Sequence, residues 1–332
     1  MVPVSLIKSG RLVLLVSVLS MLFMLVSCQR KSYSRDEAIR SLKVLNSDFV
    51  NFFAKTNEMD ELAALKFIWD HDNMPLPFPP EKFAEDKPWN PFNYENNKGV
   101  YTWDSLRKVF NKTGKSKMVR ILFSTGKLPG GEFLLTDYID TTLSSRPDFP
   151  IKLNAVLNLK GEKRLDIRHS AEVADDMPLW IKTEAETKDS KLAFTLLRTR
   201  NKDDGNLRVH FYLKNRGHRF IDTDVDALIG YSSMGYYFND IHFNMNLFNH
   251  LIKGHIVYSK IDPMAREYVE SFNANSDIQI FEMPGNHLVG NLILGKTHEK
   301  ELLDYFIRFN DGSEVLASEY LPFLDRLLNM KL

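Results

Sequence analysis

Apolar and polar residues alternate with a period of two in several runs between Met118 and Lys214, and this alternation is the strongest constraint on the fold. In the run 152–159 (KLNAVLNL), for example, every second residue from position 153 is Leu or Ala. Side chains of a β-strand point alternately to its two faces, so such runs predict strands with one apolar and one polar face. We therefore expect a large antiparallel sheet with one side in water.

Short turn sequences separate these runs. KGEK (160–163) precedes a run that begins at Leu165, and NKDDGN (201–206) separates the runs 191–198 and 207–214. Glycine and Asx residues between two alternating runs are typical of β-hairpins. Successive hairpins are therefore the expected connections within the sheet.

Helices are predicted near both ends of the mature chain. Ser34 and Glu37 have the spacing of a capping box, and apolar residues follow at intervals of three and four as far as Phe53. Asn57 can cap a second, shorter helix. Toward the C-terminus, Asp262-Pro263 predicts a helix over Met264–Phe272, and a terminal helix is expected from Ser318.

The remaining segments are a proline-rich stretch and a region of mixed pattern. Residues 75–91 contain six prolines and predict an extended loop, which is too rich in Phe and Trp to be a disordered linker and should pack along the body. The aromatic, Asn-rich segment 235–261 fits helix and strand equally well. Beyond it, strands are expected over Ile278–Glu282 and Leu288–Leu294, followed by a hairpin turn at 310–312. The alternative for Tyr305–Phe309 is the extension of a helix that begins near His298.

These patterns together predict an α+β fold, in which N-terminal and C-terminal helices pack on a large antiparallel β-sheet. We interpret residues 34–332 as a single domain, although a length of roughly 300 residues also allows two modest domains. The expected layout is 34–74 helical, 75–98 Pro-rich packed loop, 99–229 antiparallel β-rich, and 230–332 mixed with a C-terminal helix.

The first 27 residues predict export. Lys8 and Arg11 precede an apolar run of fifteen residues, 12–26, that is interrupted only by Ser17 and Ser20. At about 1.5 Å per residue a helix of this length spans roughly 22 Å, which is short of the ~30 Å hydrocarbon core of a bilayer. A secretory signal is therefore favoured over the alternative, a permanent membrane span.

The apolar run ends in Leu25-Val26-Ser27-Cys28, which resembles the lipobox of bacterial lipoproteins. The resemblance implies that residues 1–27 are a cleaved signal peptide, and that Cys28 carries diacylglycerol and an amino-terminal acyl chain such as palmitate. Residues 28–33 would then be the lipidated anchor and a short tether. Two or three acyl chains suffice for stable anchoring. The alternative is an incidental cysteine in a cleaved signal.

Cys28 is also the only cysteine of the chain, so no internal disulfide is expected. In some Gram-negative lipoproteins an Asp at the position of Gln29 retains the protein in the inner membrane. The Gln at this position therefore favours the outer membrane, on either its periplasmic or its surface side. Without Lys8 and Arg11 the chain is close to neutral, and this charge balance argues against nucleic acid or another general polyanion as a partner.

The densest histidine group consists of His242, His250 and His255, with Asp240 nearby. Intervals of eight and five residues do not place the rings on one face of a helix or of a single strand. We therefore interpret these histidines as structural and predict no metal ligand.

Asp222, Asp224 and Asp226 occupy the first three ligand positions of a calcium loop. Ala227 stands where that loop needs glycine, and Ser233 stands where it needs a bidentate glutamate. An acidic helix N-terminus is the preferred interpretation.

Motifs that demand catalysis or a cofactor are not found in the sequence. The glycines of TGKLPGGE (125–132) are expected in a turn, and the acidic pairs Asp175-Asp176 and Asp203-Asp204 also fall in predicted turns. No catalytic, cofactor-binding or metal-binding residue is predicted. A hydrolase whose carboxylates are brought together only by the fold stays open as an alternative.

Aromatic residues are numerous, with 23 Phe and 12 Tyr, and they cluster at 89–103 and 231–248. Most are expected in the core. An exposed aromatic patch for a glycan, lipid or protein partner is the alternative.

NPFNYENNKGVYTW (90–103), VRILFST (119–125) and FNDGSEVLASEYLPFLDRL (309–327) resemble segments of uncharacterised outer-membrane lipoproteins of Bacteroidota-type bacteria. The resemblance implies a cell-envelope address and no activity. The sequence thus favours a lipid-anchored envelope protein with a non-catalytic binding or structural role, whose partner is a glycan, a lipid or an envelope protein. A carrier of a lipid-like ligand in a concave sheet and the hydrolase are the alternatives.

Overall fold

The structure is a computed structural model of the 332-residue chain. It describes residues 31–71, 76–77, 92–143, 146–201, 204–232, 235–262, 265–297 and 303–321. The lipobox with Cys28, most of the Pro-rich segment and the end of the predicted terminal helix lie outside the described residues.

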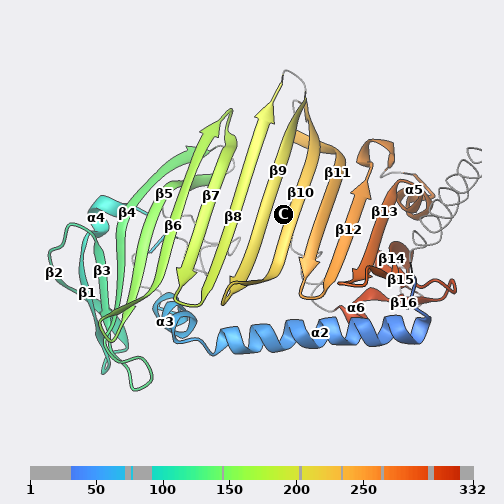
Figure 1. The fold of residues 1–332 in the computed structure, drawn as a ribbon. Coiled ribbons are helices and arrows are strands. Elements are labelled where there is room, and N and C mark those ends of the chain that lie inside the picture. The colour runs from blue at the N-terminus through green and yellow to red at the C-terminus, as the bar shows by residue number, and fades with distance from the viewer. Residues whose placement is uncertain are drawn as a thin grey trace, which may run out of the picture.

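One sheet of 16 strands dominates the described part of the chain (Figure 1). From β3 to β16 the strands are neighbours in the order of the sequence, and β1 lies between β3 and β2. All pairs are antiparallel except β1 with β3. The strands are β1 Gly99–Asp104, β2 Val109–Gly114, β3 Val119–Phe123, β4 Gly131–Leu143, β5 Arg146–Leu159, β6 Glu162–Ala174, β7 Met177–Thr187, β8 Ser190–Arg200, β9 Asp204–Asn215, β10 His218–Ser232, β11 Gly235–Leu247, β12 His250–Ile256, β13 Ser276–Glu282, β14 His287–Lys296, β15 Leu303–Arg308 and β16 Glu314–Leu316.

The helices lie around this sheet and confirm the predicted α+β class. They are α2 Arg35–Asn57, α3 Asp60–Trp69, α4 Tyr94–Asn97, α5 Tyr268–Ala274 and α6 Ala317–Tyr320, with a 3₁₀ turn η2 at Tyr258–Lys260. The capping box is present at the start of α2, where both the backbone N–H and the hydroxyl of Ser34 donate to the Glu37 carboxylate. In Figure 1, α2 runs along the lower ends of the strands from the β14 side toward α3.

Two separate hydrophobic cores form on the same face of the sheet, which we call the apolar face. The first core packs Leu42 and Leu45 of α2 against β10–β15, and it includes the cross-strand pair Ile252 and Ile280. The second packs α3 against β1–β6. The opposite face, called the polar face, carries the charged residues of the alternating runs. The period-two pattern therefore predicted correctly which residues share a face.

Three expectations for local structure were incomplete or wrong. The ambiguous segment 235–261 contains the strands β11 and β12, because cross-strand pairing satisfies its backbone. Asp222, Asp224 and Asp226 lie within strand β10 rather than at a helix N-terminus. The helix predicted from Met264 begins only at Tyr268. Within the described residues, no helix is long and apolar enough to cross a membrane.

Candidate functional sites

The first candidate site is a band of apolar side chains between the two cores, which we call the apolar strip. It lies on the apolar face of β6–β11, and its side chains belong to neither core. Registers such as Ile181↔Leu196 and Leu196↔Val209 make the strip continuous from strand to strand. Its members are Ala171, Ile181, Leu192, Phe194, Leu196, Val209, Val225 and Ile241, and each of them is only partly buried.

The partial burial of the strip reflects the arrangement of the helices. In Figure 1 the described helices lie at the lower ends of the strands and at the two flanks of the sheet, and none crosses the middle of β6–β11. Fully burying one side chain such as Leu or Phe contributes about 1.5–3 kcal/mol. An apolar ligand that covers the strip would therefore gain a substantial hydrophobic free energy.

A groove of about 900 Å³ adjoins the lower end of the strip. It lies between the second half of α2 and the turns that follow β7, β9 and β11. The rings of Phe52, Phe220 and Phe248 are in mutual contact along it, with centroids 5.0–5.8 Å apart. Lys55 and Arg216 also line the groove, and neither forms an ion pair with a described residue. The groove thus combines an aromatic wall with available positive charge, although Asp48 and Asp189 lie at it as well.

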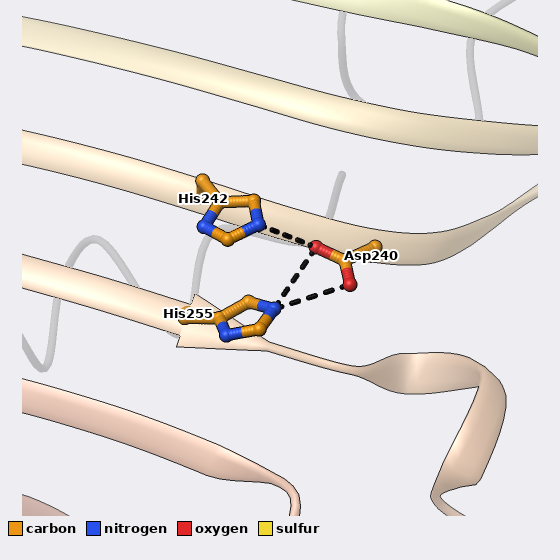
Figure 2. Close-up of side chains that lie close together, drawn as sticks. All are labelled: Asp240, His242 and His255. Carbon is orange, nitrogen blue, oxygen red and sulfur yellow. Dashed lines mark hydrogen bonds and ion pairs between the residues drawn. The ribbon is translucent and has the colours of Figure 1, made fainter.

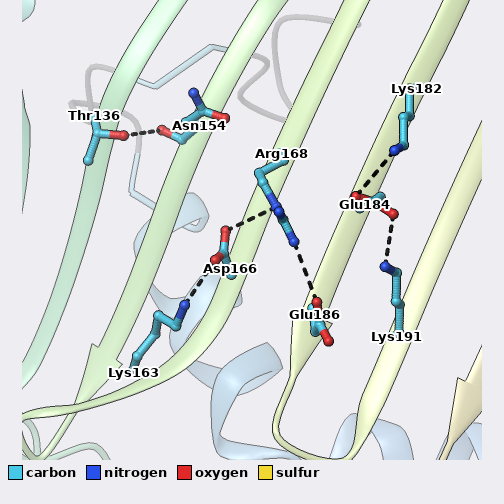
Figure 3. Close-up of polar contacts among 9 residues, drawn as sticks. All are labelled: Thr136, Asn154, Lys163, Asp166, Arg168, Lys182, Glu184, Glu186 and Lys191. Carbon is cyan, nitrogen blue, oxygen red and sulfur yellow. Dashed lines mark hydrogen bonds and ion pairs between the residues drawn. The ribbon is translucent and has the colours of Figure 1, made fainter. Parts of the chain in front are cut away.

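The polar face of β5–β8 carries a ladder of polar contacts (Figure 3). Asp166 accepts from Lys163 at 3.0 Å, and Arg168 reaches both Asp166 and Glu186. Lys191 donates to Glu184 at 2.8 Å; this hydrogen bond lowers the pKa of Glu184 and raises the pKa of Lys191. These carboxylates are engaged with cations on neighbouring strands, which is typical of a solvated sheet face.

Two of the three clustered histidines come together with Asp240 on the polar face (Figure 2). The β11–β12 hairpin places His242 directly opposite His255, and their rings stack with centroids 3.9 Å apart. The Nε2 atom of His242 lies 3.0 Å from Asp240, and that of His255 lies 3.1 Å from it. The sequence analysis considered only a single helix or a single strand, whereas residues on adjacent strands can share a face irrespective of their interval along the chain. Assigning residues 235–256 to a β-hairpin would have predicted that His242 and His255 lie opposite each other.

His250 lies elsewhere, in a buried network that joins α2 to the sheet. Ser41 on α2 accepts from His250 Nε2 at 2.7 Å, and its own hydroxyl donates to Glu282 at the end of β13. The second ring nitrogen of His250 has no hydrogen-bond partner. Burial lowers the pKa of His250, so the neutral ring is favoured. The serine proton is directed at the glutamate rather than at the histidine, so this arrangement fixes the helix and does not resemble an activated nucleophile.

Two of the three aspartates of β10, Asp222 and Asp226, bind arginine side chains, and none of the three is part of a calcium loop. Asp226 accepts from Arg208 at 2.8 Å, and Asp222 accepts from Arg219 at 2.6 Å and from His210 at 2.9 Å. Burial raises the pKa of Asp222, but the hydrogen bonds from Arg219 and His210 lower it below the ordinary value.

The other candidates occupy the expected places. Residues 124–130 form the turn between β3 and β4. Asp175 and Asp176 form the turn after β6, where Asp175 pairs with Arg200 at 2.7 Å. Asp204 begins β9, and Asp203 lies outside the described residues.

The aromatic clusters divide between core and surface. Trp103 contacts Phe67 and Phe110 in the second core, whereas Tyr236 and Tyr237 in β11 are about half exposed, at 50% and 51%. The expected core aromatics are therefore present, and the two exposed tyrosines point to opposite faces of β11 because they are successive residues of a strand.

The described chain begins three residues after Cys28. Lys31 accepts from the backbone N–H of Leu288, and Tyr33 donates to the carbonyl of the same residue. Comparisons of the chain with protein-family models, curated proteins and solved structures returned no match.

Proposed function

We propose that this chain is a lipid-anchored protein of the bacterial cell envelope, most simply of the outer membrane, that binds a lipid-like ligand without catalysis. The observation that carries the proposal is the apolar strip, a continuous and partly exposed apolar surface between two closed cores. Surfaces of this kind mark binding sites for apolar partners.

The dimensions of the strip suit an acyl chain. Its six strands, spaced about 4.8 Å apart, extend over roughly 24 Å, whereas the acyl layer of one leaflet is about 15 Å thick. Each buried CH₂ group contributes about 0.8 kcal/mol. The strip residues themselves carry no hydrogen-bonding side chains, although His169, Thr183 and Thr223 lie in the register row of Phe194 on the same face. His169 and Thr183 are hydrogen-bonded to each other, so the strip favours a lipid-like ligand over a glycan.

The groove next to the strip suits a negatively charged or polar head group. Ser190 and Asn215 line the groove and are paired across β8 and β9, two residues from the strip residue Leu192 and its partner Leu213. A ligand whose chain lies on the strip would therefore bring its head group near Lys55 and Arg216. The hydrolase alternative finds less support, since Asp166, Glu184 and Glu186 on the polar face are engaged by Lys and Arg.

The test compares two adjacent leucines on opposite faces of β8. Leu196 belongs to the strip, and Leu197 is 48% exposed on the polar face. Native mass spectrometry of the detergent-extracted protein should detect a stoichiometric lipid, and a fluorescent fatty acid should bind and be displaced by that lipid. Leu196→Asn should weaken fatty-acid binding about tenfold, the equivalent of ~1.4 kcal/mol. Leu197→Asn is the matched control and should bind as the wild type does. Equal effects of the two substitutions, or no binding by the wild type, would refute the proposal.

A further inference from the structure

We propose that Asp240, His242 and His255 form a binding site for a divalent transition-metal ion such as Zn²⁺ on the polar face of the sheet (Figure 2). The proposal does not depend on the ligand of the apolar strip, because the two sites lie on opposite faces.

The backbone places the three side chains at the corners of a triangle. Asp240 and His242 are two residues apart on β11, so they point to the same face, and His255 is the direct cross-strand neighbour of His242. This arrangement is set by strand register and not by a flexible loop. The donor atoms, one from each residue, lie within 4.8 Å of one another.

The distances between the donor atoms are close to those around a bound metal. Zn²⁺ binds His nitrogen and carboxylate oxygen at about 2.0–2.2 Å, so two ligand atoms of a tetrahedral site lie roughly 3.4 Å apart. The contacts from His242 Nε2 and His255 Nε2 to the Asp240 oxygens are 3.0–3.2 Å. Both Nε2 atoms lie beside the same carboxylate, so a cation placed among them would be in reach of all three side chains.

Metal binding requires the two imidazole rings to turn. In the structure the rings are nearly parallel, with an angle of 12° between their planes, and both nitrogen lone pairs must point at a common centre. His242 and His255 have side chains that are 61% and 42% exposed, so neither ring is confined by packing. The rotation therefore needs no change in the backbone.

The charged side chains in and beside the proposed metal site carry a net negative charge. Asp226 lies opposite His242 on β10, and Asp277 lies opposite His255 on β13. Arg208 is held by Asp226, and Lys253 on β12 is 5.7 Å from the Phe281 ring centroid. The three carboxylates in and beside the site thus exceed the positive charge around it, which favours a cation.

The donor set selects the type of metal. Two imidazole nitrogens with one carboxylate suit Zn²⁺ and similar ions, whereas Ca²⁺ takes six to eight oxygen ligands. Three protein ligands on an exposed face leave a coordination position for water or for an anionic group of a ligand.

A second cluster provides an internal control. His210, Asp222 and Asp224 on β9 and β10 have donor atoms that also lie within 4.8 Å of one another. There, however, the guanidinium of Arg219 binds Asp222 at 2.6 Å and occupies the place of a cation. The control cluster should therefore bind no metal.

The experiment is isothermal titration of the detergent-purified full protein with ZnCl₂, in a buffer that does not bind zinc. We expect one Zn²⁺ per chain, and His242→Ala and His255→Ala should each weaken binding by at least about tenfold. His210→Gln should bind zinc as the wild type does. Circular dichroism of each variant checks that the sheet is retained, and Asp240→Asn provides a substitution of nearly unchanged size.

A spectroscopic readout identifies the ligands independently. Co²⁺ in place of zinc should give the visible absorption of a site with nitrogen ligands, and His255→Ala should abolish it. The proposal is overturned if the wild type takes up no zinc at micromolar concentration. It is equally overturned if folded His242→Ala and His255→Ala bind zinc as tightly as the wild type, because the metal would then lie elsewhere.

Discussion

The ring of Tyr33 stacks on the imidazole of His287, with centroids 4.9 Å apart and planes within 9° of parallel. Backbone hydrogen bonds between residues 31–33 and Leu288 hold the same segment beside β14. Only Gln29 and Arg30 separate Cys28 from this attachment, and three residue steps span at most about 11 Å. If Cys28 is lipidated, the start of β14 must therefore lie close to the membrane surface.

The first prediction concerns the anchor itself. Cys28→Ser should release the protein from the membrane fraction, since the thioether to diacylglycerol cannot form and the remaining apolar run is too short for a stable span. Carbonate extraction followed by intact-mass analysis measures both the partition and the loss of the lipid mass. Cys28→Ser protein that stays in the membrane fraction would indicate a retained transmembrane segment instead.

The second prediction concerns the attachment at Tyr33. Burial raises the pKa of the Tyr33 hydroxyl, and the Glu282 carboxylate that accepts its hydrogen bond raises it further. Tyr33→Ala removes both the stacking and this hydrogen bond, and it should lower the free energy of unfolding by about 1–3 kcal/mol. Urea unfolding measures the change. Tyr236→Ala, at an exposed tyrosine, is the control and should change it by less than about 0.5 kcal/mol.

The third prediction concerns Arg198, which is 2% exposed on the apolar face. Its guanidinium donates to the carbonyls of Ala174, Met177 and Pro178 and to the hydroxyl of Tyr231, all of them uncharged acceptors. Arg198→Met leaves buried carbonyl groups without donors, so stability should fall by about 2–4 kcal/mol.

The matched control for Arg198 is on the same strand. Arg200 pairs with Asp175 and lies over the Tyr231 ring, but it is exposed. Arg200→Met should therefore cost less than about 1 kcal/mol. Thermal or urea unfolding measures the loss of stability in each variant. Equal losses would show that the buried hydrogen bonds of Arg198 stabilise the protein no more than the exposed ion pair of Arg200 does.

The fourth prediction concerns the dependence of stability on pH. Burial lowers the pKa of both His250 and His169, so the unfolded chain binds protons at these sites more readily than the folded chain does. The contribution of the two neutral histidines to the free energy of unfolding is therefore fully present above the unfolded histidine pKa of about 6.5, and it is lost as the pH falls below that value. Glu282 and Asp48, which face His250, oppose the shift but do not reverse it.

His250→Gln tests this dependence. The loss of stability between pH 7 and pH 5.5, measured by urea unfolding, should be smaller in His250→Gln than in the wild type, and smaller still when His169→Gln is added. The absolute stability of His250→Gln should also fall, because the hydrogen bond to Ser41 is altered. An unchanged pH dependence in the single variant would contradict a buried neutral His250.

Local pattern was sufficient to predict most of the secondary structure. Alternation with a period of two predicted the strands from β3 to β9, and the Ser34–Glu37 capping box predicted the start of α2, because both signals arise from neighbouring residues. The signal was weak where apolar residues lay on both faces, as in the segment that forms β11 and β12. It also failed at Asp222–Asp226, because acidic residues on the polar face of a strand look the same as those at a helix N-terminus.

The sequence by itself therefore determined which residues share a face of a strand and where the hairpin turns lie. Both depend on patterns within two to four neighbouring residues. Tertiary structure alone decided the parallel pairing of β1 with β3 and what each face of the sheet meets. Register across β11 and β12 joined His242 to His255, and among the described residues the positions of α2 and α3 at one end of the strands divided a single apolar face into two cores and a partly buried strip. Such relationships depend on packing between residues that are tens to hundreds of positions apart, as with Ser41 and Glu282, and no local periodicity records them.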